Sequence, residues 1–411
     1  KSHFITNFMI LKETLKNIVK AQRENLDLVE FGVEREILRE IDINLPFVIV
    51  LSGVRRSGKS TLLRQIMGKS KNFYYLNFED SRIANFEVED FQKLDEVFLE
   101  EYGSRDYYFF DEIQNVQKWE LFIRTLLEKK KHIVITGSNA SLLSKELGTR
   151  LTGRHLRFEL FPFSYKEFLT LTNKKPSIAS FEEYFVDGGF PEYLKLKKPI
   201  ILQELLNDIL IRDIAVRYKL RSLKILKELA LYMLTNVGKE FSYNNLKKMV
   251  NLGSTNSVIS FVSYFEDSYL SFPIPKFDFS LRKQLVNPKK SYSIDNGLIN
   301  INSASFSQDK GKMLENVVFI GLRKKYNNIF YFKEKRECDF ILKEGTIITK
   351  AIQVCYNLNE DNKDREINGL LEALDKFKLN NGLILTYNQE DYFNVGNKKI
   401  RVIPVWKWLL I

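Results

Sequence analysis

The stretch Phe47-Val-Ile-Val-Leu-Ser-Gly-Val-Arg-Arg-Ser-Gly-Lys-Ser-Thr61 decides the fold. It begins with an apolar run, passes through a loop with two glycines and continues into the helical pattern Thr61-Leu-Leu-Arg-Gln-Ile66. An apolar strand followed at once by a loop and a helix is the βα unit of a parallel sheet, in which both faces of the strand are buried. We therefore expect a parallel α/β domain around this stretch.

The loop itself matches a phosphate-binding pattern. Gly53 to Ser60 fits G-x-x-x-x-G-K-[ST] without a mismatch, between a strand and a helix. Its backbone N–H groups and the helix N-terminus suit the phosphates of ATP or ADP. We expect Lys59 to reach the β- and γ-phosphates and the Ser60 hydroxyl to bind Mg²⁺. The predicted nucleotide-binding residues are Gly53, Val54, Arg55, Arg56, Ser57, Gly58, Lys59, Ser60 and Thr61.

Three further apolar segments repeat the strand pattern. Residues 73–78, 107–111 and 133–136 are predicted strands, with helices near 87–102 and 118–129 between them and a helix over 10–28 before them. Such alternation indicates a doubly wound α/β sheet, here a parallel sheet that carries the P-loop.

Two acids end the strand Tyr107-Tyr-Phe-Phe-Asp-Glu112. A P-loop enzyme needs a carboxylate for Mg²⁺ at the end of a neighbouring strand. We expect Asp111 to hold the ion, directly or through water, and Glu112 to polarise the attacking water. Adjacent acids at a strand end also occur as solvated charges, and it is the P-loop nearby that favours catalysis.

Polar residues also follow the strand Ile133-Val-Ile-Thr136. In AAA+ ATPases a residue here senses the γ-phosphate, so Ser138 or Asn139 is a candidate sensor. Arg154 is predicted to stabilise transition-state charge, in its own or a neighbouring subunit of a homo-oligomer, or else to be a surface charge. The predicted catalytic residues are Lys59, Glu112, Asn139 and Arg154.

The whole chain has 411 residues, a formal net charge of +11, 44% hydrophobic residues and 28% charged residues. This length suggests about two to four domains, each able to bury a core. The charge favours an acidic partner, most often nucleic acid, although a solvated excess of Lys gives the same total. Two cysteines argue against a zinc or disulfide framework. No long apolar run and no signal-peptide pattern are present, so we expect a cytoplasmic protein that does not span a membrane.

These motifs, with Leu151-Thr-Gly-Arg-His-Leu-Arg-Phe-Glu-Leu-Phe-Pro-Phe163, resemble archaeal and bacterial AAA-type ATPases that carry a C-terminal domain of unknown function. The resemblance continues through Gly188-Gly-Phe-Pro-Glu-Tyr193, Arg212-Asp-Ile214 and Tyr292-Ser-Ile-Asp-Asn-Gly297. It implies an AAA+ module followed by a winged helix. We expect an ATPase domain at 1–160, a helical lid or connector at 161–220, a winged helix at 221–300 and a last domain at 301–411.

The middle region fits that expectation. Residues 241–250 and 254–264 are predicted as two helices, capped by Ser242 and by Ser254 or Thr255. The second helix would be the recognition helix that meets DNA. In the wing that follows, Arg282, Lys283, Lys289 and Lys290 are predicted to contact phosphates. A winged helix used for protein contacts is the alternative.

The last domain shows a new α/β pattern. A helix at 312–325, strands at 329–333, 338–342 and 347–356, a helix at 364–378 and strands at 382–386 and 401–405 are predicted. This order resembles the PD-(D/E)xK restriction-nuclease fold, in which carboxylates hold Mg²⁺ and a lysine orients water. The possible second metal site is Glu315, Asp339 and Gln353.

That second site departs from the nuclease pattern. Gln353 replaces a carboxylate and Cys355 stands where the lysine is expected, with Lys350 or Lys363 as possible substitutes. A scaffold that binds DNA or protein is favoured over an active nuclease. The leading hypothesis is an ATPase whose nucleotide state controls DNA binding. The alternatives are an ATP-coupled nuclease and a signalling-type ATPase switch that acts on protein partners.

Overall fold

The computed structural model describes residues 10–28, 30–70, 72–138, 153–220, 222–304 and 309–411. The chain divides into two compact units, Lys1–Leu160 and Phe161–Ile411. Of the helices in the described part of the chain, none combines the length and the apolar character that a membrane crossing needs.

The first unit is built on a five-stranded sheet in the order β2-β3-β4-β1-β5, in which all neighbours run parallel. Its strands are β1 (Val48–Gly53), β2 (Phe73–Asn77), β3 (Tyr107–Asp111), β4 (His132–Gly137) and β5 (His155–Leu160). Its helices are α1 (Lys12–Leu28), η1 (Glu36–Arg39), α2 (Lys59–Met67), η2 (Ser81–Ile83), α3 (Asp90–Tyr102), η3 (Ile113–Asn115) and α4 (Trp119–Glu128).

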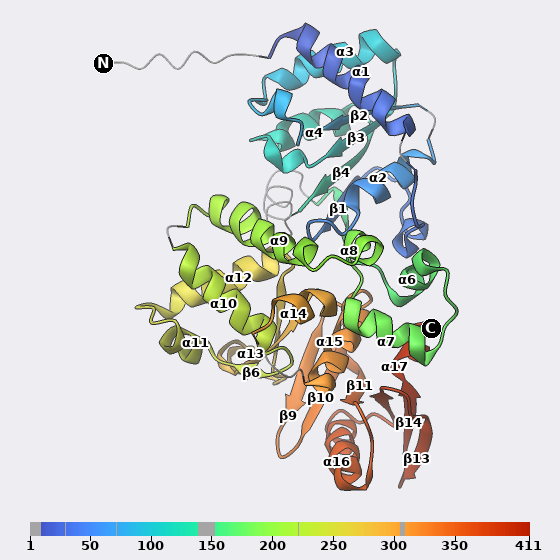
Figure 1. Cartoon of the computed structure of the whole chain (residues 1–411), viewed down its shortest axis with the longest axis vertical. Helices are drawn as coiled ribbons and strands as arrows, with labels where there is room; N and C mark the ends of the chain where they lie inside the picture. The colour runs from blue at the N-terminus through green and yellow to red at the C-terminus, as the bar shows by residue number, and fades with distance from the viewer. Residues whose placement is uncertain (1–9, 29, 71, 139–152, 221, 305–308) are drawn as a thin grey trace. The chain divides into compact units, whose positions relative to one another are not determined.

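Helices cover both faces of this sheet, which explains why its strands are so apolar. Val48 and Val50 of β1 pack with side chains of α1, α3 and α4 on one face. Ile49 and Leu51 point the other way, because neighbouring strand residues alternate, and they pack against α2. Figure 1 shows α1 and α3 side by side over the sheet. The prediction of a parallel α/β fold is confirmed.

The second unit begins with helices that the sequence pattern had suggested for this region. They are α6 (Tyr165–Thr172), α7 (Ile178–Asp187), α8 (Pro191–Leu196), α9 (Ile200–Asp208), the π-helical η4 (Ile209–Val216) and α10 (Leu223–Thr235). The loop before α8 passes very close to the start of α14 (Asn296–Asn302). There the Asp295 carboxylate accepts hydrogen bonds from the backbone N–H of Gly189, at 2.6 Å, and of Leu298, at 3.0 Å.

A small sheet follows in the order β6-β8-β7, with antiparallel neighbours. Its strands are β6 (Glu240–Phe241), β7 (Ser271–Pro275) and β8 (Lys289–Ser293). The helices α11 (Tyr243–Met249) and α12 (Thr255–Asp267) lie between β6 and β7, and α13 (Leu281–Val286) lies in the β7–β8 connection. Ser242 caps α11 and Ser254 caps α12 through their side-chain oxygens, as predicted. Pro273 and Pro275 are tolerated because β7 is an edge strand.

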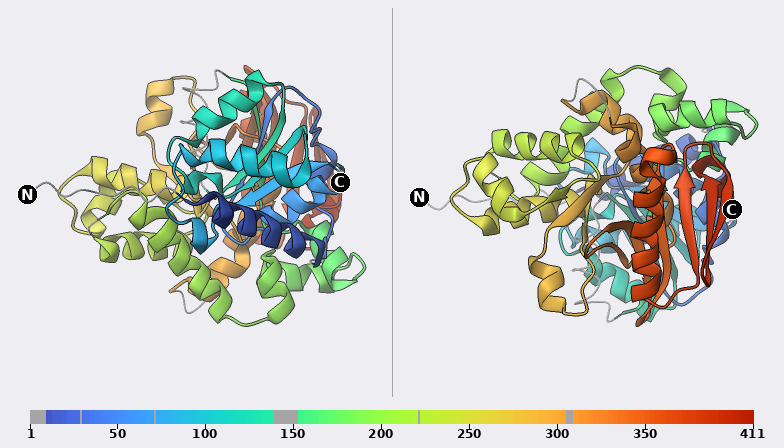
Figure 2. Two further views of the ribbon diagram at one scale, coloured as in Figure 1. Left: turned by 90° about the horizontal axis from the view of Figure 1, so that it is seen from above. Right: turned by 90° about the horizontal axis from the view of Figure 1, so that it is seen from below.

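The last part of the unit is a six-stranded mixed sheet in the order β13-β14-β12-β11-β10-β9. Its strands are β9 (Ile329–Lys333), β10 (Glu337–Glu344), β11 (Ile347–Cys355), β12 (Asn381–Thr386), β13 (Asp391–Val395) and β14 (Lys398–Pro404). The helices are α15 (Lys310–Arg323), α16 (Glu360–Lys376) and α17 (Val405–Trp408). Figure 2 shows α16 alongside strands of this sheet, and the helix contacts β10, β11 and β12.

Candidate active site

The P-loop follows β1 directly and is shaped by close packing. A Cβ atom on Gly53 would lie 2.2 Å from the carbonyl oxygen of Leu160 at the end of β5, so the chain needs glycine here. Gly58 precedes α2 with a φ of +96°, a conformation that L side chains rarely adopt. The two glycines therefore let the loop turn sharply from the buried strand into the helix.

Lys59 is almost fully buried and its ammonium group points back across the loop. It donates hydrogen bonds to the carbonyl oxygens of Gly53, at 3.1 Å, and Val54, at 3.2 Å. It also lies 3.7 Å from Oε1 of Glu112. The structure thus brings the predicted phosphate-binding cation and the predicted water-polarising acid together.

Asp111 ends β3 beside the start of α2 and is only 1% exposed. Its Oδ1 accepts a hydrogen bond from the Thr136 hydroxyl of the neighbouring strand β4, and Ser60 lines the same cavity as the Asp111 carboxylate. Burial raises the pKa of Asp111, and the charge of Glu112 raises it further. Among the described residues, no hydrogen-bond donor reaches its buried Oδ2.

That buried acceptor fits a metal ion. Buried carboxylate oxygens normally have a partner, and a hard oxygen ligand next to a serine hydroxyl is the donor type that Mg²⁺ takes. Asp111 and Ser60 therefore have the right chemistry and the right neighbours for the predicted ion.

Glu112 adopts a left-handed backbone conformation with a φ of +52°, which is unusual for a residue other than glycine. Its backbone N–H donates to Thr136 Oγ1 at 2.9 Å, and its carboxylate accepts a hydrogen bond from Gln114. Thr136 thus contacts both acids at once. The sequence analysis did not identify Thr136 as a site residue. The only signal for this role in the sequence is that Thr136 lies on the strand next to β3.

Arg35 also contacts the P-loop. Its buried guanidinium donates to the carbonyl oxygen of Ser57 at 2.7 Å. Its backbone N–H donates to Oε1 of Gln65 on α2, and the Gln65 amide donates to the carbonyl oxygens of Phe31 and Val33 at 2.8 Å each. The segment before η1 is therefore fastened to both the loop and the helix. The sequence analysis did not single out Arg35 or Gln65.

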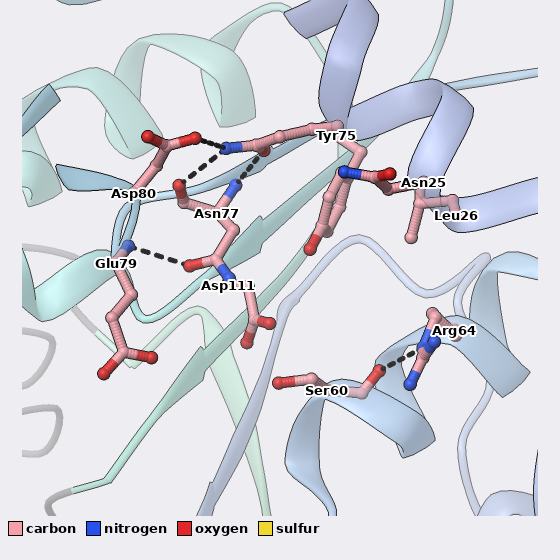
Figure 3. A pocket seen from close by; sticks show the side chains of 10 residues that line it. Asn25, Leu26, Ser60, Arg64, Tyr75, Asn77, Glu79, Asp80 and Asp111 are labelled. Atoms are coloured by element: carbon pink, nitrogen blue, oxygen red, sulfur yellow. Dashed lines mark hydrogen bonds between the residues drawn. The ribbon is translucent and has the colours of Figure 1, made fainter. Parts of the chain in front are cut away.

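A cavity of about 380 Å³ opens beside Ser60 and Asp111. Figure 3 shows its polar lining, which comes from α1, α2 and the ends of β2 and β3. Gln22 of α1 donates to the Asn77 carbonyl and to Asp80, and it accepts from the Asn77 N–H, so it continues the hydrogen-bonding edge of β2. The volume is within the usual range for small-molecule sites, which starts at about 300 Å³.

The other predicted phosphate-sensing residues are not all brought to this site. Ser138 is buried just after β4, and Asn139 lies outside the described residues. Arg154 is exposed and precedes β5, whose first residue pairs with Val48 and whose last, Leu160, pairs with Gly53. Arg154 therefore lies at the opposite end of the strand from the P-loop, about 20 Å away along an extended chain. A role at the phosphates of its own chain is not supported by this placement.

The second predicted site forms a buried cluster, but with a different set of partners. Glu315 of α15 and Asp339 of β10 do approach each other, and the ammonium group of Lys290 from β8 lies between them. Its Nζ is 2.9 Å from Glu315 Oε1, 3.0 Å from Asp339 Oδ1 and 2.6 Å from Glu337 Oε1. The prediction that Lys290 contacts DNA phosphates from a wing is therefore wrong, because its side chain is 1% exposed and points into this cluster.

Gln353 does not face the cluster as a metal ligand would. Its Oε1 accepts from the backbone N–H of Asp339 at 3.2 Å, and its amide donates to Glu366 at 2.6 Å. The two lysines proposed as substitutes also lie elsewhere. Lys350 donates to the Tyr326 hydroxyl, and Lys363 lies over the ring of Phe393. Cys355, buried on β11, has a thiol pKa raised to about 11 by burial.

Two of the three remaining basic residues predicted for the wing lie on the short helix α13, and the third begins β8. Arg282 and Lys283 are exposed on α13. Lys289 is half-buried, donates to the carbonyl oxygens of Gln284 and Leu285, and has a pKa lowered by burial. Two of the four predicted phosphate contacts are thus freely accessible.

Comparison with known proteins agrees with this arrangement. Residues 46–169 match a family described as an AAA domain, and residues 178–309 and 310–408 match two domains of unknown function, DUF8612 and DUF4143. The uncharacterized protein MJ1544 of Methanocaldococcus jannaschii is 37% identical over 420 residues, covering 94% of each chain. An uncharacterized protein of Haemophilus influenzae is 31% identical and covers 89% of this chain and 94% of its own.

Solved structures give weaker likenesses. AMPPCP-bound DnaA from Aquifex aeolicus has a TM-score of 0.29 at 16% identity, covering 63% of this chain and 92% of that one. The STAND protein PH0952 from Pyrococcus horikoshii, which has a tetratricopeptide repeat sensor, has a TM-score of 0.29 at 17% identity, covering 72% and 46%. Scores this low carry no argument about function. The near full-length match shows that the chain belongs to the same protein family as MJ1544. Within that family it carries an AAA-type ATPase domain at residues 46–169.

Proposed function

We propose that this protein binds ATP with Mg²⁺ at the P-loop and hydrolyses it. The observation that carries the proposal is the convergence of Lys59, Ser60, Asp111 and Glu112, with one Asp111 oxygen buried and lacking a donor among the described residues. Phosphoryl transfer needs positioning and charge stabilisation more than covalent chemistry, and these four side chains supply both.

Each of the four residues takes a separate role in this proposal. Lys59 binds the β- and γ-phosphates in place of the loop carbonyl oxygens that its ammonium group contacts. Ser60 and Asp111 hold Mg²⁺, which neutralises charge on the phosphates. Glu112 orients the attacking water and accepts its proton. The left-handed backbone of Glu112 and its hydrogen bond to Thr136 fix where its carboxylate lies.

Two substitutions test this proposal. Lys59→Ala should abolish nucleotide binding, and Glu112→Gln should bind ATP but retain it without turnover. A matched control is Arg124→Ala, which removes only an exposed ion pair with Glu128 on α4. Binding is measured by calorimetry and turnover by phosphate release. Turnover at the control rate in both site variants would refute the assignment.

We infer further that the middle of the second unit is a winged helix and that it binds DNA. The order α10, β6, α11, α12, β7, β8 and the sheet order β6-β8-β7 support a winged helix. α12, the expected recognition helix, contains no Lys or Arg. Phosphate contact would therefore rest on Lys247 and Lys248 of α11 and on Arg282 and Lys283 of α13.

The tip of the β7–β8 connection carries a second feature that suits DNA. Phe279, Leu281, Leu285 and Val286 are 65–77% exposed, beside the basic residues of α13. Apolar side chains flanked by cations are used by proteins that enter the minor groove and wedge between base steps. The helix α13, gold in Figure 2, forms the projecting tip of this connection.

A gel-shift titration tests DNA binding. The affinity of the wild type should fall steeply between 50 and 200 mM salt, because phosphate contacts release counterions. The double variant Arg282→Ala/Lys283→Ala should bind more weakly and show a shallower salt slope. Lys224→Ala, on an exposed lysine of α10, is the control. Equal binding by all three proteins, or no salt-sensitive binding with or without ATP, would refute this part of the proposal.

Experiments on the same purified protein distinguish two other functions from the proposed one. A signalling-type switch without DNA would show a nucleotide-dependent change in mass by light scattering and no gel shift. A nuclease would cut plasmid or branched DNA in the presence of Mg²⁺ or Mn²⁺, and Asp339→Ala would lose that activity. We propose instead that the last domain, whose order α15, β9, β10, β11, α16, β12 supports a nuclease-like fold, serves as a scaffold.

A further inference from the structure

The cluster around Lys290 joins parts of the second unit that are far apart in sequence. Lys290 comes from β8, Glu315 from α15, and Glu337 and Asp339 from β10. An ammonium group has three N–H donors, and here three carboxylates lie within hydrogen-bonding distance, at 2.6, 2.9 and 3.0 Å. The donors of Lys290 are therefore fully used by these acids.

The surrounding groups hold Glu315 and Asp339 in place. Glu315 accepts from Lys312 at 2.6 Å and from the Tyr292 hydroxyl. Asp339 Oδ2 accepts from the Val354 backbone N–H at 3.0 Å. Both acids are buried, and each would be costly to keep ionised without a cation beside it.

The charge state of the cluster follows from these contacts. Burial opposes the charge of Lys290, but Glu315, Asp339 and Glu337 around it hold its pKa well above the usual range. Burial also opposes ionisation of Glu315, yet Lys290 and Lys312 hold the pKa of Glu315 below its usual value. Lys333 also lies 3.2 Å from Glu337 Oε2 and 3.0 Å from Glu240 Oε1. With this pair included, four carboxylates and three ammonium groups give −4 + 3 = −1 for the cluster.

We propose that this cluster is a divalent-metal site in which the ammonium group of Lys290 has replaced the metal ion. Carboxylates from a helix and an adjacent strand, converging on one point, are the ligands of a hard cation. The point on which they converge is filled by Nζ of Lys290.

Lys312 does not serve equally well as the replacing cation. It contacts Glu315 Oε2 alone among the three acids, and its side chain is 28% exposed at the edge of the cluster, whereas Lys290 contacts all three acids from the centre. Removing the Lys290 charge would leave −4 + 2 = −2 among these groups. One divalent cation would neutralise that charge. The acid oxygens would need to move inward by about 0.5–0.9 Å, since Mn²⁺ and Mg²⁺ bind oxygen at about 2.0–2.2 Å.

Two properties follow from this replacement. The last domain holds no metal at the place where a nuclease of this fold would need one. The replacing cation also ties β8, which belongs to the small sheet, to α15 and β10 of the last domain. The inference concerns the second unit alone and is independent of the ATP site.

The test restores the metal by removing the lysine. Lys290→Met is prepared in an Asp111→Asn background, which removes the proposed P-loop metal ligand, and thermal unfolding is followed without nucleotide in EDTA and in 1 mM Mn²⁺. The Lys290→Met protein should have a lowered Tm in EDTA, and Mn²⁺ should raise that Tm by about 5 °C or more. The Asp111→Asn parent, which keeps Lys290, should show no Mn²⁺ shift.

A charge-balanced variant is the control. Lys290→Met/Asp339→Asn removes one cation and one anion together, so it should respond to Mn²⁺ far less than Lys290→Met. If Lys290→Met is unfolded in EDTA, Mn²⁺ should restore the folded protein. A Lys290→Met protein that gains nothing from Mn²⁺, whether it is folded or unfolded in EDTA, would overturn the proposal. So would a Mn²⁺ shift of equal size in the parent.

Discussion

Replacing Arg35 by Met should weaken ATP binding although Arg35 belongs to no nucleotide-binding motif. The guanidinium holds the Ser57 carbonyl oxygen at 2.7 Å from inside the protein. That hydrogen bond fixes one peptide of the P-loop and so helps to orient the neighbouring N–H groups toward phosphate. Without it the loop must be ordered when ATP binds, and the cost of that ordering reduces the affinity.

The size of the effect can be estimated from this one contact. A hydrogen bond to a charged group contributes about 1.5–3 kcal/mol. Each 1.4 kcal/mol is a factor of ten, so the Kd for ATP should rise roughly 10- to 150-fold. Met retains most of the buried stem of the side chain, which limits the packing loss.

The measurement is a calorimetric titration with ATP and Mg²⁺, accompanied by the Tm of each protein without nucleotide. Arg39→Met is the matched control, because Arg39 lies in the following turn η1, is 84% exposed and makes only a surface ion pair at 3.6 Å with Glu34. That pair should contribute little. If Arg35→Met binds ATP as tightly as Arg39→Met, while its Tm alone is lowered, Arg35 stabilises the fold and does not order the P-loop.

Three further predictions use other parts of the structure. Thr136→Val removes the hydroxyl that contacts both acids of the site, so steady-state turnover should fall about 10- to 100-fold with little change in the Kd for ATP, and an equal loss of affinity would contradict it. Gly297→Ala places a Cβ 2.1 Å from the Asp187 carbonyl oxygen and should cost about 1–3 kcal/mol or more in urea unfolding, whereas Gly253→Ala, with open space around it, should be nearly neutral. Lys290, Lys333 and Lys312 hold the pKa of Glu337 at about 2 against burial, from a usual 4.5, so ionised Glu337 stabilises the fold above pH 4.5 and that contribution is lost as the pH falls toward 2. The loss of stability in Glu337→Gln should therefore reach at most about 3 kcal/mol near pH 6 and shrink toward pH 2.5. A pH-independent difference would contradict that assignment.

Three strands of the first unit, β1, β3 and β4, were predictable because both of their faces are buried. The edge strand β2 was predictable because its residues are mostly aromatic or apolar although every second one is only half-buried. The runs at 47–51, 73–78, 107–111 and 133–136 each correspond to a strand of the parallel sheet. β5 was not predicted as a strand, because this edge strand, His155–Leu160, is mostly half-buried and alternates charged with apolar residues. β13, Asp391–Val395, was missed for the same reason, since it lies at the edge of its sheet and is largely exposed.

The nucleotide site was predictable where its chemistry lies within one motif. Lys59 and Ser60 begin α2 after the loop that follows β1, and the pair Asp111-Glu112 lies at the end of β3. The carboxyl ends of parallel strands meet at one edge of the sheet. Arg35 could not be found in this way. It lies 24 residues before Lys59, outside any strand, and only the folded chain brings it to the loop.

The pair Lys289-Lys290 shows why a charge pattern alone misplaces a site. Two neighbours on a strand point to opposite faces, so when β8 packs one face against α15 and β10, only one of the two lysines can stay near the wing. Lys289 takes the outer side and caps the end of α13, while Lys290 turns inward. Which of them turns inward depends on the register of β8, where Lys290 pairs with Glu240 and Ile274. The cation between Glu315 and Asp339 is therefore selected by the strand pairing of β8, and the charge pattern of the sequence does not identify it.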